Sequence, residues 1–67
     1  MKQIDNYFLD DLIGKSKAES IKLCEENGYN YRVVREDSNK YAITMDFRFD
    51  RINLWIHNGL ITKCDIG

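Results

Sequence analysis

The chain has 67 residues, of which 43% are hydrophobic and 31% charged, and its 10 Lys and Arg residues are matched by 11 Asp and Glu residues. A chain of this length buries only about 60% of the surface that its unfolded form exposes, so it forms one small domain, residues 1–67, and large enzymes with deep cavities are excluded. The formal net charge of −1 argues against a general nucleic-acid binder, which carries a clustered basic face.

The first part of the chain predicts an arm followed by one helix. Residues 1–8 are expected to form the arm. Ser16 and Glu19 then form a capping box, in which the Ser16 hydroxyl accepts a hydrogen bond from the third helical N–H and the Glu19 side chain reaches back. Gly28 supplies a left-handed end, so we expect the helix over residues 17–26.

Two strands are expected next, over residues 29–36 and 51–57. The first is rich in Tyr and Val, which favour strands. The second alternates clearly, with Ile52, Leu54 and Ile56 on one side and polar residues and a tryptophan on the other. This alternation predicts one face on the core and one face away from it.

A third strand is expected over residues 60–66. Asn58-Gly59 permits a tight primed turn, which predicts an antiparallel hairpin with the preceding strand. The apolar residues Ile61 and Cys64 are not two positions apart, so we expect a bulge in this strand.

Residues 37–50 lie between the first two strands and are too long for a hairpin turn. They contain several large apolar side chains, in which we discern no periodic pattern. A loop of this length in so small a domain is usually functional or disordered, and the apolar content argues against disorder.

The two cysteines, Cys24 and Cys64, lack the spacing and the Cys or His companions of a zinc site. We expect two buried thiols, with a single disulfide as the alternative if the protein works outside the cell. The chain has no stretch that matches a membrane span or a signal peptide. We therefore expect a cytoplasmic protein, unless a leader was removed.

The residues offer little for catalysis. The one histidine, His57, falls on the outward side of a strand without an evident nucleophile beside it. Asp46 and Asp50 lack the spacing of a calcium loop, and the glycines do not form a phosphate-binding motif. We therefore expect no enzyme, no catalytic residue, no cofactor and no metal ion.

The segment from Ile43 to Leu54 resembles the most characteristic segment of the potato inhibitor I family, which includes eglin-like and barley chymotrypsin inhibitors of serine proteases. Leu12-Ile13-Gly14-Lys15 is similar to the Leu-Val-Gly-Lys sequence that leads into the helix of that family, and Gly67 matches its final glycine. Arg51-Ile52-Asn53-Leu54 is most similar to the bacterial members. The resemblance covers most of the chain in the same order.

This resemblance implies an α+β fold, in which one helix packs on a small mixed sheet of about three strands. The first two strands would be parallel and joined by a long exposed reactive loop. Met45 would occupy the primary specificity position, and Met45-Asp46 would be the scissile bond. The protease-binding loop would consist of Tyr41, Ala42, Ile43, Thr44, Met45, Asp46, Phe47 and Arg48. Judged by residue type alone, Met45 would instead fill the core.

The resemblance also implies support for the loop from the second strand. Arg51 would reach under the loop and hydrogen-bond it, because a planar guanidinium with five donors suits this task, and Asp46 is a candidate acceptor. Without the resemblance, Arg48 and Arg51 would be surface arginines near Asp50. Asn53 stands where plant members carry a second supporting arginine.

The function expected from the resemblance is inhibition of a subtilisin-like or chymotrypsin-like serine protease by a monomer, without nucleic-acid or membrane partners. The alternative is a cytoplasmic, non-inhibitory interaction module on the same scaffold, of a phage or host-defence kind, because a fold does not fix a function. Self-association through an exposed strand edge or loop is a third hypothesis.

Overall fold

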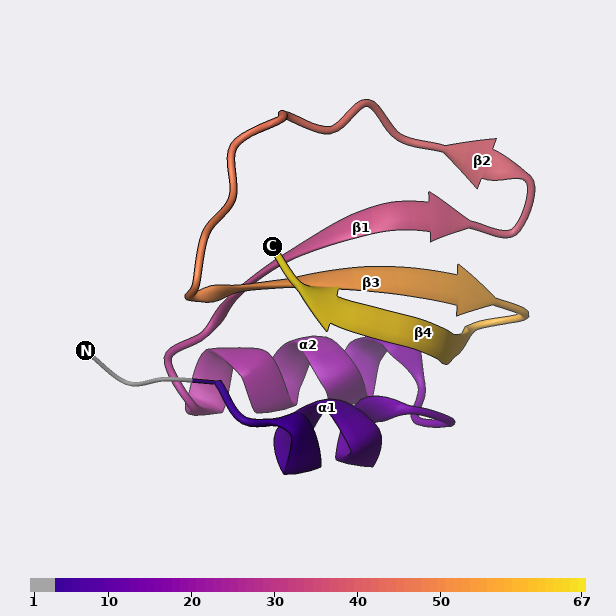
Figure 1. Cartoon of the computed structure of the whole chain (residues 1–67). Coiled ribbons are helices and arrows are strands. Elements are labelled where there is room, and N and C mark those ends of the chain that lie inside the picture. The colour runs from indigo at the N-terminus through magenta and orange to yellow at the C-terminus, as the bar shows by residue number, and fades with distance from the viewer. Residues whose placement is uncertain (1–3) are drawn as a thin grey trace.

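The computed structural model describes residues 4–67, and it packs two helices on one side of a four-stranded mixed sheet (Figure 1). The elements are α1 (Asn6–Leu12), α2 (Lys17–Glu26), β1 (Asn30–Glu36), β2 (Asn39–Lys40), β3 (Arg51–His57) and β4 (Leu60–Ile66). The predicted α+β class is confirmed, with one more helix and one more strand than expected. Within residues 4–67, the structure has no helix of the length and apolarity that crossing a membrane requires.

The predicted arm over residues 1–8 is wrong for its described part. Asp5 caps α1, because its carboxylate Oδ1 accepts a hydrogen bond of 2.8 Å from the backbone N–H of Phe8. Ile4 and Leu12 are buried at 3% and 0% exposure, so apolar burial holds this segment against the rest of the chain. Residues 1–3 of the expected arm lie outside the described residues.

The predicted helix over residues 17–26 is confirmed as α2. The Ser16 hydroxyl accepts a hydrogen bond of 3.1 Å from the Glu19 N–H, as the capping box predicts. Gly28 has a φ of +73°, the left-handed conformation that ends the helix. The helix buries Ser20 and Cys24 completely.

The sheet has the strand order β2-β1-β3-β4. The central pair, β1 and β3, is parallel, as the family resemblance implied. Residues in register across this pair include Tyr31 with Ile52 and Arg32 with Asn53. This register brings polar side chains from separate parts of the chain close together on the sheet.

The hairpin of β3 and β4 has the predicted turn and the predicted bulge. Asn58 and Gly59 both have a positive φ, as a primed turn requires. Trp55 pairs with Lys63 and the next residue of β3 pairs with Ile61, so β4 has one extra residue between them.

The core lies between the helices and the face of β3 that carries Ile52, Leu54 and Ile56, all of which are at most 2% exposed. Both cysteines are free thiols, so the alternative of a disulfide is not realised. Cys24 is buried and burial raises its pKa to about 11, whereas Cys64 is only half-buried. The expectation of two buried thiols is therefore correct for Cys24 and only in part for Cys64.

The segment predicted as a loop over residues 37–50 begins with a strand. Asp37 has a φ of +55°, which lets the chain reverse tightly after β1. β2 then pairs antiparallel with β1, with Arg35 opposite Lys40. The expected loop is therefore shorter, and it runs from residue 41 to residue 50.

Candidate functional site

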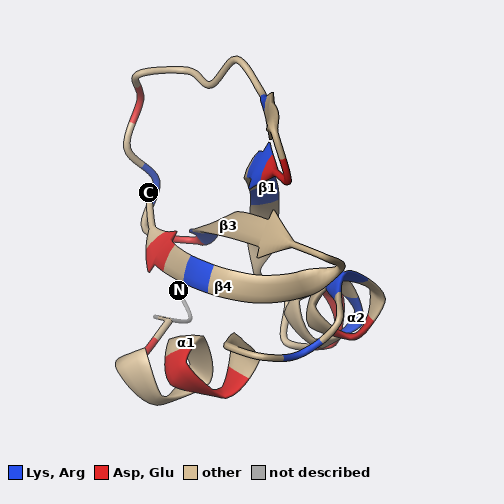
Figure 2. Cartoon of the chain, turned by 90° about the vertical axis from the view of Figure 1, so that its right-hand side faces the viewer, with Lys and Arg blue, Asp and Glu red and all other residues tan. Residues whose placement is uncertain are grey.

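Residues 41–50, called the arch below, connect β2 to β3 on the side of the sheet away from both helices (Figures 1 and 2). Both ends of the arch are fixed to β1 by backbone hydrogen bonds. The Tyr41 N–H donates to the Val34 carbonyl over 3.1 Å, and the Asn30 N–H donates to the Asp50 carbonyl over 2.8 Å. The arch is thus an extended span between two anchored ends.

Large apolar residues occupy every second position of the arch, and all of them are exposed. Their exposed fractions are 47% for Tyr41, 45% for Ile43, 97% for Met45, 62% for Phe47 and 67% for Phe49. The interpretation that this segment lacks a periodic pattern is therefore wrong, because the period of two is that of an extended chain. The interpretation that Met45 fills the core is also wrong.

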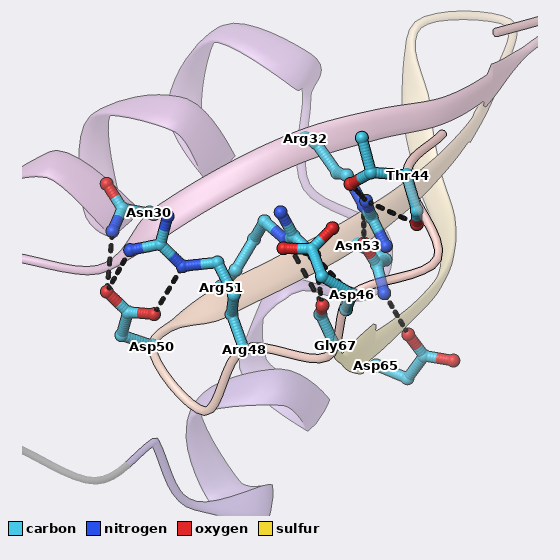
Figure 3. A network of polar contacts seen from close by, with 10 residues as sticks. All are labelled: Asn30, Arg32, Thr44, Asp46, Arg48, Asp50, Arg51, Asn53, Asp65 and Gly67. Carbon is cyan, nitrogen blue, oxygen red and sulfur yellow. Dashed lines mark hydrogen bonds and ion pairs between the residues drawn. The ribbon is translucent and has the colours of Figure 1, made fainter. Parts of the chain in front are cut away.

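Arg51 supports the arch from the beginning of β3 (Figure 3). Its Nη2 donates to the Asp46 carbonyl over 2.8 Å and lies 3.6 Å from the Asp46 carboxylate. The same guanidinium donates to the carbonyl of Gly67 from Nε and from Nη2, over 3.1 and 2.6 Å. Its side chain is only 12% exposed, so Arg51 ties the arch to the last residue of the chain.

Arg32, on β1, provides a second support that the sequence analysis missed. Its Nη1 donates to the carbonyl of Thr44 over 3.3 Å and to the Thr44 hydroxyl over 3.1 Å. The two guanidiniums therefore hold the carbonyl groups of the residues on either side of Met45. The sequence signal for Arg32 was its place in a strand, but only the register of β1 with β3 brings it under the arch.

Asn53 has no direct contact with the arch among the hydrogen bonds of residues 4–67. Its Oδ1 accepts from the Nε of Arg32, and its Nδ2 donates to the Asp65 carboxylate over 2.9 Å. The predicted support by Asn53 thus acts through Arg32. Asp65 and Gly67 are further members of the network that sequence reasoning did not select (Figure 3).

The part of the arch that follows Met45 has additional contacts. The Arg48 N–H donates to the Gly67 carbonyl over 3.1 Å, and the Arg48 guanidinium forms two hydrogen bonds of 3.1 Å with the Asp50 carboxylate. The rings of Phe47 and Phe49 pack edge to face with centroids 5.0 Å apart. Tyr41, Ala42 and Ile43, which precede the residues held by the guanidiniums, are exposed as well.

The electrostatics of the arch keep its carboxylates ionised. A hydrogen bond from the Thr44 hydroxyl lowers the pKa of Asp46, with smaller contributions from the charges of Arg51 and Arg32. Hydrogen bonding by Arg48 likewise lowers the pKa of Asp50. At neutral pH these groups act as hydrogen-bond acceptors rather than as proton donors.

A separate hollow lies on the same face of the sheet, beyond the supported part of the arch. Trp55 is half-buried in it, with the Lys63 ammonium 4.5 Å from its ring centroid. His57 borders this hollow and is exposed, 3.5 Å from the carboxylate of Asp37. No group of three or more His, Cys, Asp or Glu residues suited to a metal ion occurs within residues 4–67.

Searches of protein-family models and of curated proteins found no match to this chain. The arch presents an extended backbone with an exposed apolar residue between two fixed carbonyl groups. This arrangement is suited to docking into another protein's cleft.

Proposed function

We propose that this chain inhibits serine proteases of the subtilisin or chymotrypsin kind and belongs with the potato inhibitor I family. The arch enters the protease cleft as a substrate-like segment, and Met45 fills the primary specificity pocket. One observation carries the proposal: Met45 is 97% exposed, and the carbonyls of Thr44 and Asp46 on either side of it are held by guanidiniums from the sheet.

Preorganisation of the arch raises its affinity for a protease. Ordering the backbone of one flexible residue costs roughly 1–2 kcal/mol, and this cost reduces the affinity of a mobile peptide. In this chain the residues around Met45 are already held by Arg32 and Arg51 before any protease binds. More of the contact free energy therefore appears as affinity.

The chemistry of the bond explains why such a segment inhibits instead of being consumed. The serine hydroxyl of the protease attacks the Met45 carbonyl and forms an ester, and the hydroxyl proton passes through the protease's general base to the Asp46 nitrogen, which leaves as a neutral amine. If the amine stays in place, it attacks the ester, returns that proton to the serine oxygen and re-forms the peptide bond. Water completes hydrolysis only when the amine moves away. Retention of Asp46 by Arg51 favours re-formation.

The shape and chemistry of the arch fit a protease cleft. Met45 is unbranched and apolar, which suits a deep apolar pocket. Its neighbours Ile43 and Phe47 project further apolar surface at the two-residue spacing of an extended substrate. An interface of the usual protease-inhibitor size, about 1,600 Å² in total, would involve much of the arch.

A panel of subtilisin-like and chymotrypsin-like proteases tests this proposal, with the wild type, Met45→Asp and Tyr7→Asp compared. Tyr7 is the matched control, because it is an exposed apolar residue, 86% exposed, on α1 and away from the arch. We expect nanomolar or tighter inhibition by the wild type and Tyr7→Asp of at least one enzyme, and a large loss for Met45→Asp. Equal inhibition by all three, or none by the wild type, would refute the proposal.

A non-inhibitory interaction module remains the second candidate function, and the hollow around Trp55 favours it. Arg35 and Lys63 border this hollow, and it lies outside the supported part of the arch. A partner identified by affinity capture and then purified would separate the two candidates. Binding that survives Met45→Asp but is lost on Trp55→Ala supports the module, whereas the opposite pattern supports inhibition.

A further inference from the structure

The two halves of the arch are supported from different strands, and the support of the first half is built from three side chains in one row of the sheet. Arg32 lies opposite Asn53 across β1 and β3, and Asn53 lies opposite Asp65 across β3 and β4. Hydrogen bonds connect Asp65 to Asn53 and Asn53 to Arg32 (Figure 3). Arg32 in turn donates to the Thr44 hydroxyl.

We propose that Arg32, oriented by Asp65 through Asn53, is the positioning residue that determines whether the arch inhibits a protease or is cleaved as a substrate. This inference rests on the proposed function of the arch. It assigns to β1 and β4 a role that the resemblance gave only to β3.

The side-chain amide of Asn53 is held in one orientation by hydrogen bonds at both of its ends. An ionised carboxylate only accepts hydrogen bonds, so Asp65 holds the NH₂ end of the Asn53 amide. The oxygen end must then face Arg32, where it accepts from Nε. Asn53 is 8% exposed, so water competes little for either end.

The guanidinium of Arg32 links the Asn53 amide to Thr44. Its five N–H donors lie in one rigid plane, so fixing Nε also fixes the direction of the other nitrogens. With Nε on Asn53, Nη1 reaches both the carbonyl and the hydroxyl of Thr44. A lysine at this position would supply the charge but not two donors in a fixed relation.

Arg32 and Arg51 hold residues on opposite sides of the bond that the protease would cleave. After attack at Met45, Arg32 still holds Thr44 on the acyl side, while Arg51 holds Asp46 on the amine side. Re-formation needs both ends within reach of each other, because the effective concentration of a held amine far exceeds that of a free one. Loss of either support lets water compete for the ester.

The experiment measures two rates for each variant with an inhibited protease: association, and net hydrolysis of Met45-Asp46. We expect Arg32→Gln to associate at nearly the wild-type rate but to be hydrolysed about ten-fold faster or more, since hydrogen bonds from charged donors contribute strongly. Arg35→Gln is the matched control on β1, because Arg35 donates to the Asp37 carbonyl and not to the arch. Arg32→Lys should restore part of the resistance.

Asp65→Ala separates a positioning role from a general loss of stability. Among the hydrogen bonds of residues 4–67, Asp65 reaches the arch through Asn53 and Arg32. We therefore expect faster hydrolysis from Asp65→Ala alone, but little further increase when it is added to Arg32→Gln. Independent, additive effects of the two substitutions would overturn the inference, as would wild-type hydrolysis of Arg32→Gln.

NMR relaxation of the free protein distinguishes failure of this inference from failure of the proposed function. Arg32→Gln should increase backbone mobility at Thr44, and Arg51→Gln should increase it at Asp46. Inhibition without faster hydrolysis of Arg32→Gln would reject the inference and leave the inhibitor function standing. Absence of any inhibited protease would reject the function, and unchanged mobility at Thr44 would then reject the positioning role as well.

Discussion

The two faces of the sheet differ in what holds them in place. On the helix face, Leu12, Ile52 and Leu54 are fully buried and pack without directional contacts. On the arch face, large apolar side chains are exposed, and two guanidiniums hold the backbone by hydrogen bonds. The first arrangement stabilises the fold by burial, whereas the second fixes the backbone of one segment by directional contacts.

This difference indicates which contacts mark a functional segment in a small domain. Apolar burial is non-directional and scales with area, so it explains why the chain folds but not why a particular loop is extended. Hydrogen bonds from Arg32 and Arg51 depend on position and direction. They are the feature of the arch that needs a functional explanation.

The largest expected effect on stability lies on the helix face. Leu54→Ala deletes a completely buried side chain in the centre of β3 and should lower the free energy of unfolding by about 2–5 kcal/mol. Urea denaturation measures this loss. If packing on the helix face does not determine the conformation of the arch, the NMR signals of residues 44–46 should change little in the same variant. A rearranged arch would contradict this independence of the two faces.

Arg51→Gln should have the next largest effect, because it removes hydrogen bonds to both Asp46 and Gly67. We expect a loss of roughly 1.5–3 kcal/mol in the free energy of unfolding, since charged donors form the stronger hydrogen bonds. Arg48→Gln is the control, as its guanidinium is bonded to Asp50 at the surface and is half exposed. A loss for Arg48→Gln as large as that for Arg51→Gln would contradict a special role for Arg51.

Acid should loosen the arch before it affects the core. The Thr44 hydroxyl and the two guanidiniums lower the pKa of Asp46 below its ordinary value of 3.8. The contribution of the ionised form is therefore fully present above pH 3.8 and is lost as the pH falls through the lowered pKa. Carbon NMR of the Asp46 carboxyl measures the midpoint. Thr44→Val should move that midpoint upward, and a wild-type midpoint at or above 3.8 would contradict the contact.

Met45→Asp should have the smallest effect on stability, because the side chain is almost fully exposed. We expect the free energy of unfolding to change by no more than about 0.5 kcal/mol. Thermal unfolding measures the change, next to Tyr7→Asp as a second exposed site. A substantial destabilisation would mean that Met45 packs within the protein and would weaken its assignment as the docking residue.

Local signals in the sequence predicted the elements that local physics governs. The capping box of Ser16 and Glu19 defined the beginning of α2, and Gly28 its end. Strict alternation located β3, and Asn58-Gly59 located its turn into β4. These signals lie within a few residues of the structure that they specify, so one sequence was enough to recognise them.

Two missed elements depend on contacts between distant residues. The short helix α1 was not expected, although Asp5 caps it, because its existence depends on burial of Leu12 against the rest of the chain. The two-residue strand β2 depends on pairing with β1. The alternation from Tyr41 to Phe49 differs from these elements, because it is a local pattern that is present in the sequence itself.

The sequence by itself determined the helix α2, the strand β3 and its hairpin with β4, because caps, turns and periodicity act over a few neighbouring residues. Only the tertiary structure decided that Arg32 and Arg51 meet the arch at the carbonyls on either side of Met45. That outcome depends on the parallel register of β1 with β3. Alternation within a segment decides which face its side chains occupy, whereas the pairing of two segments decides which residues lie opposite each other.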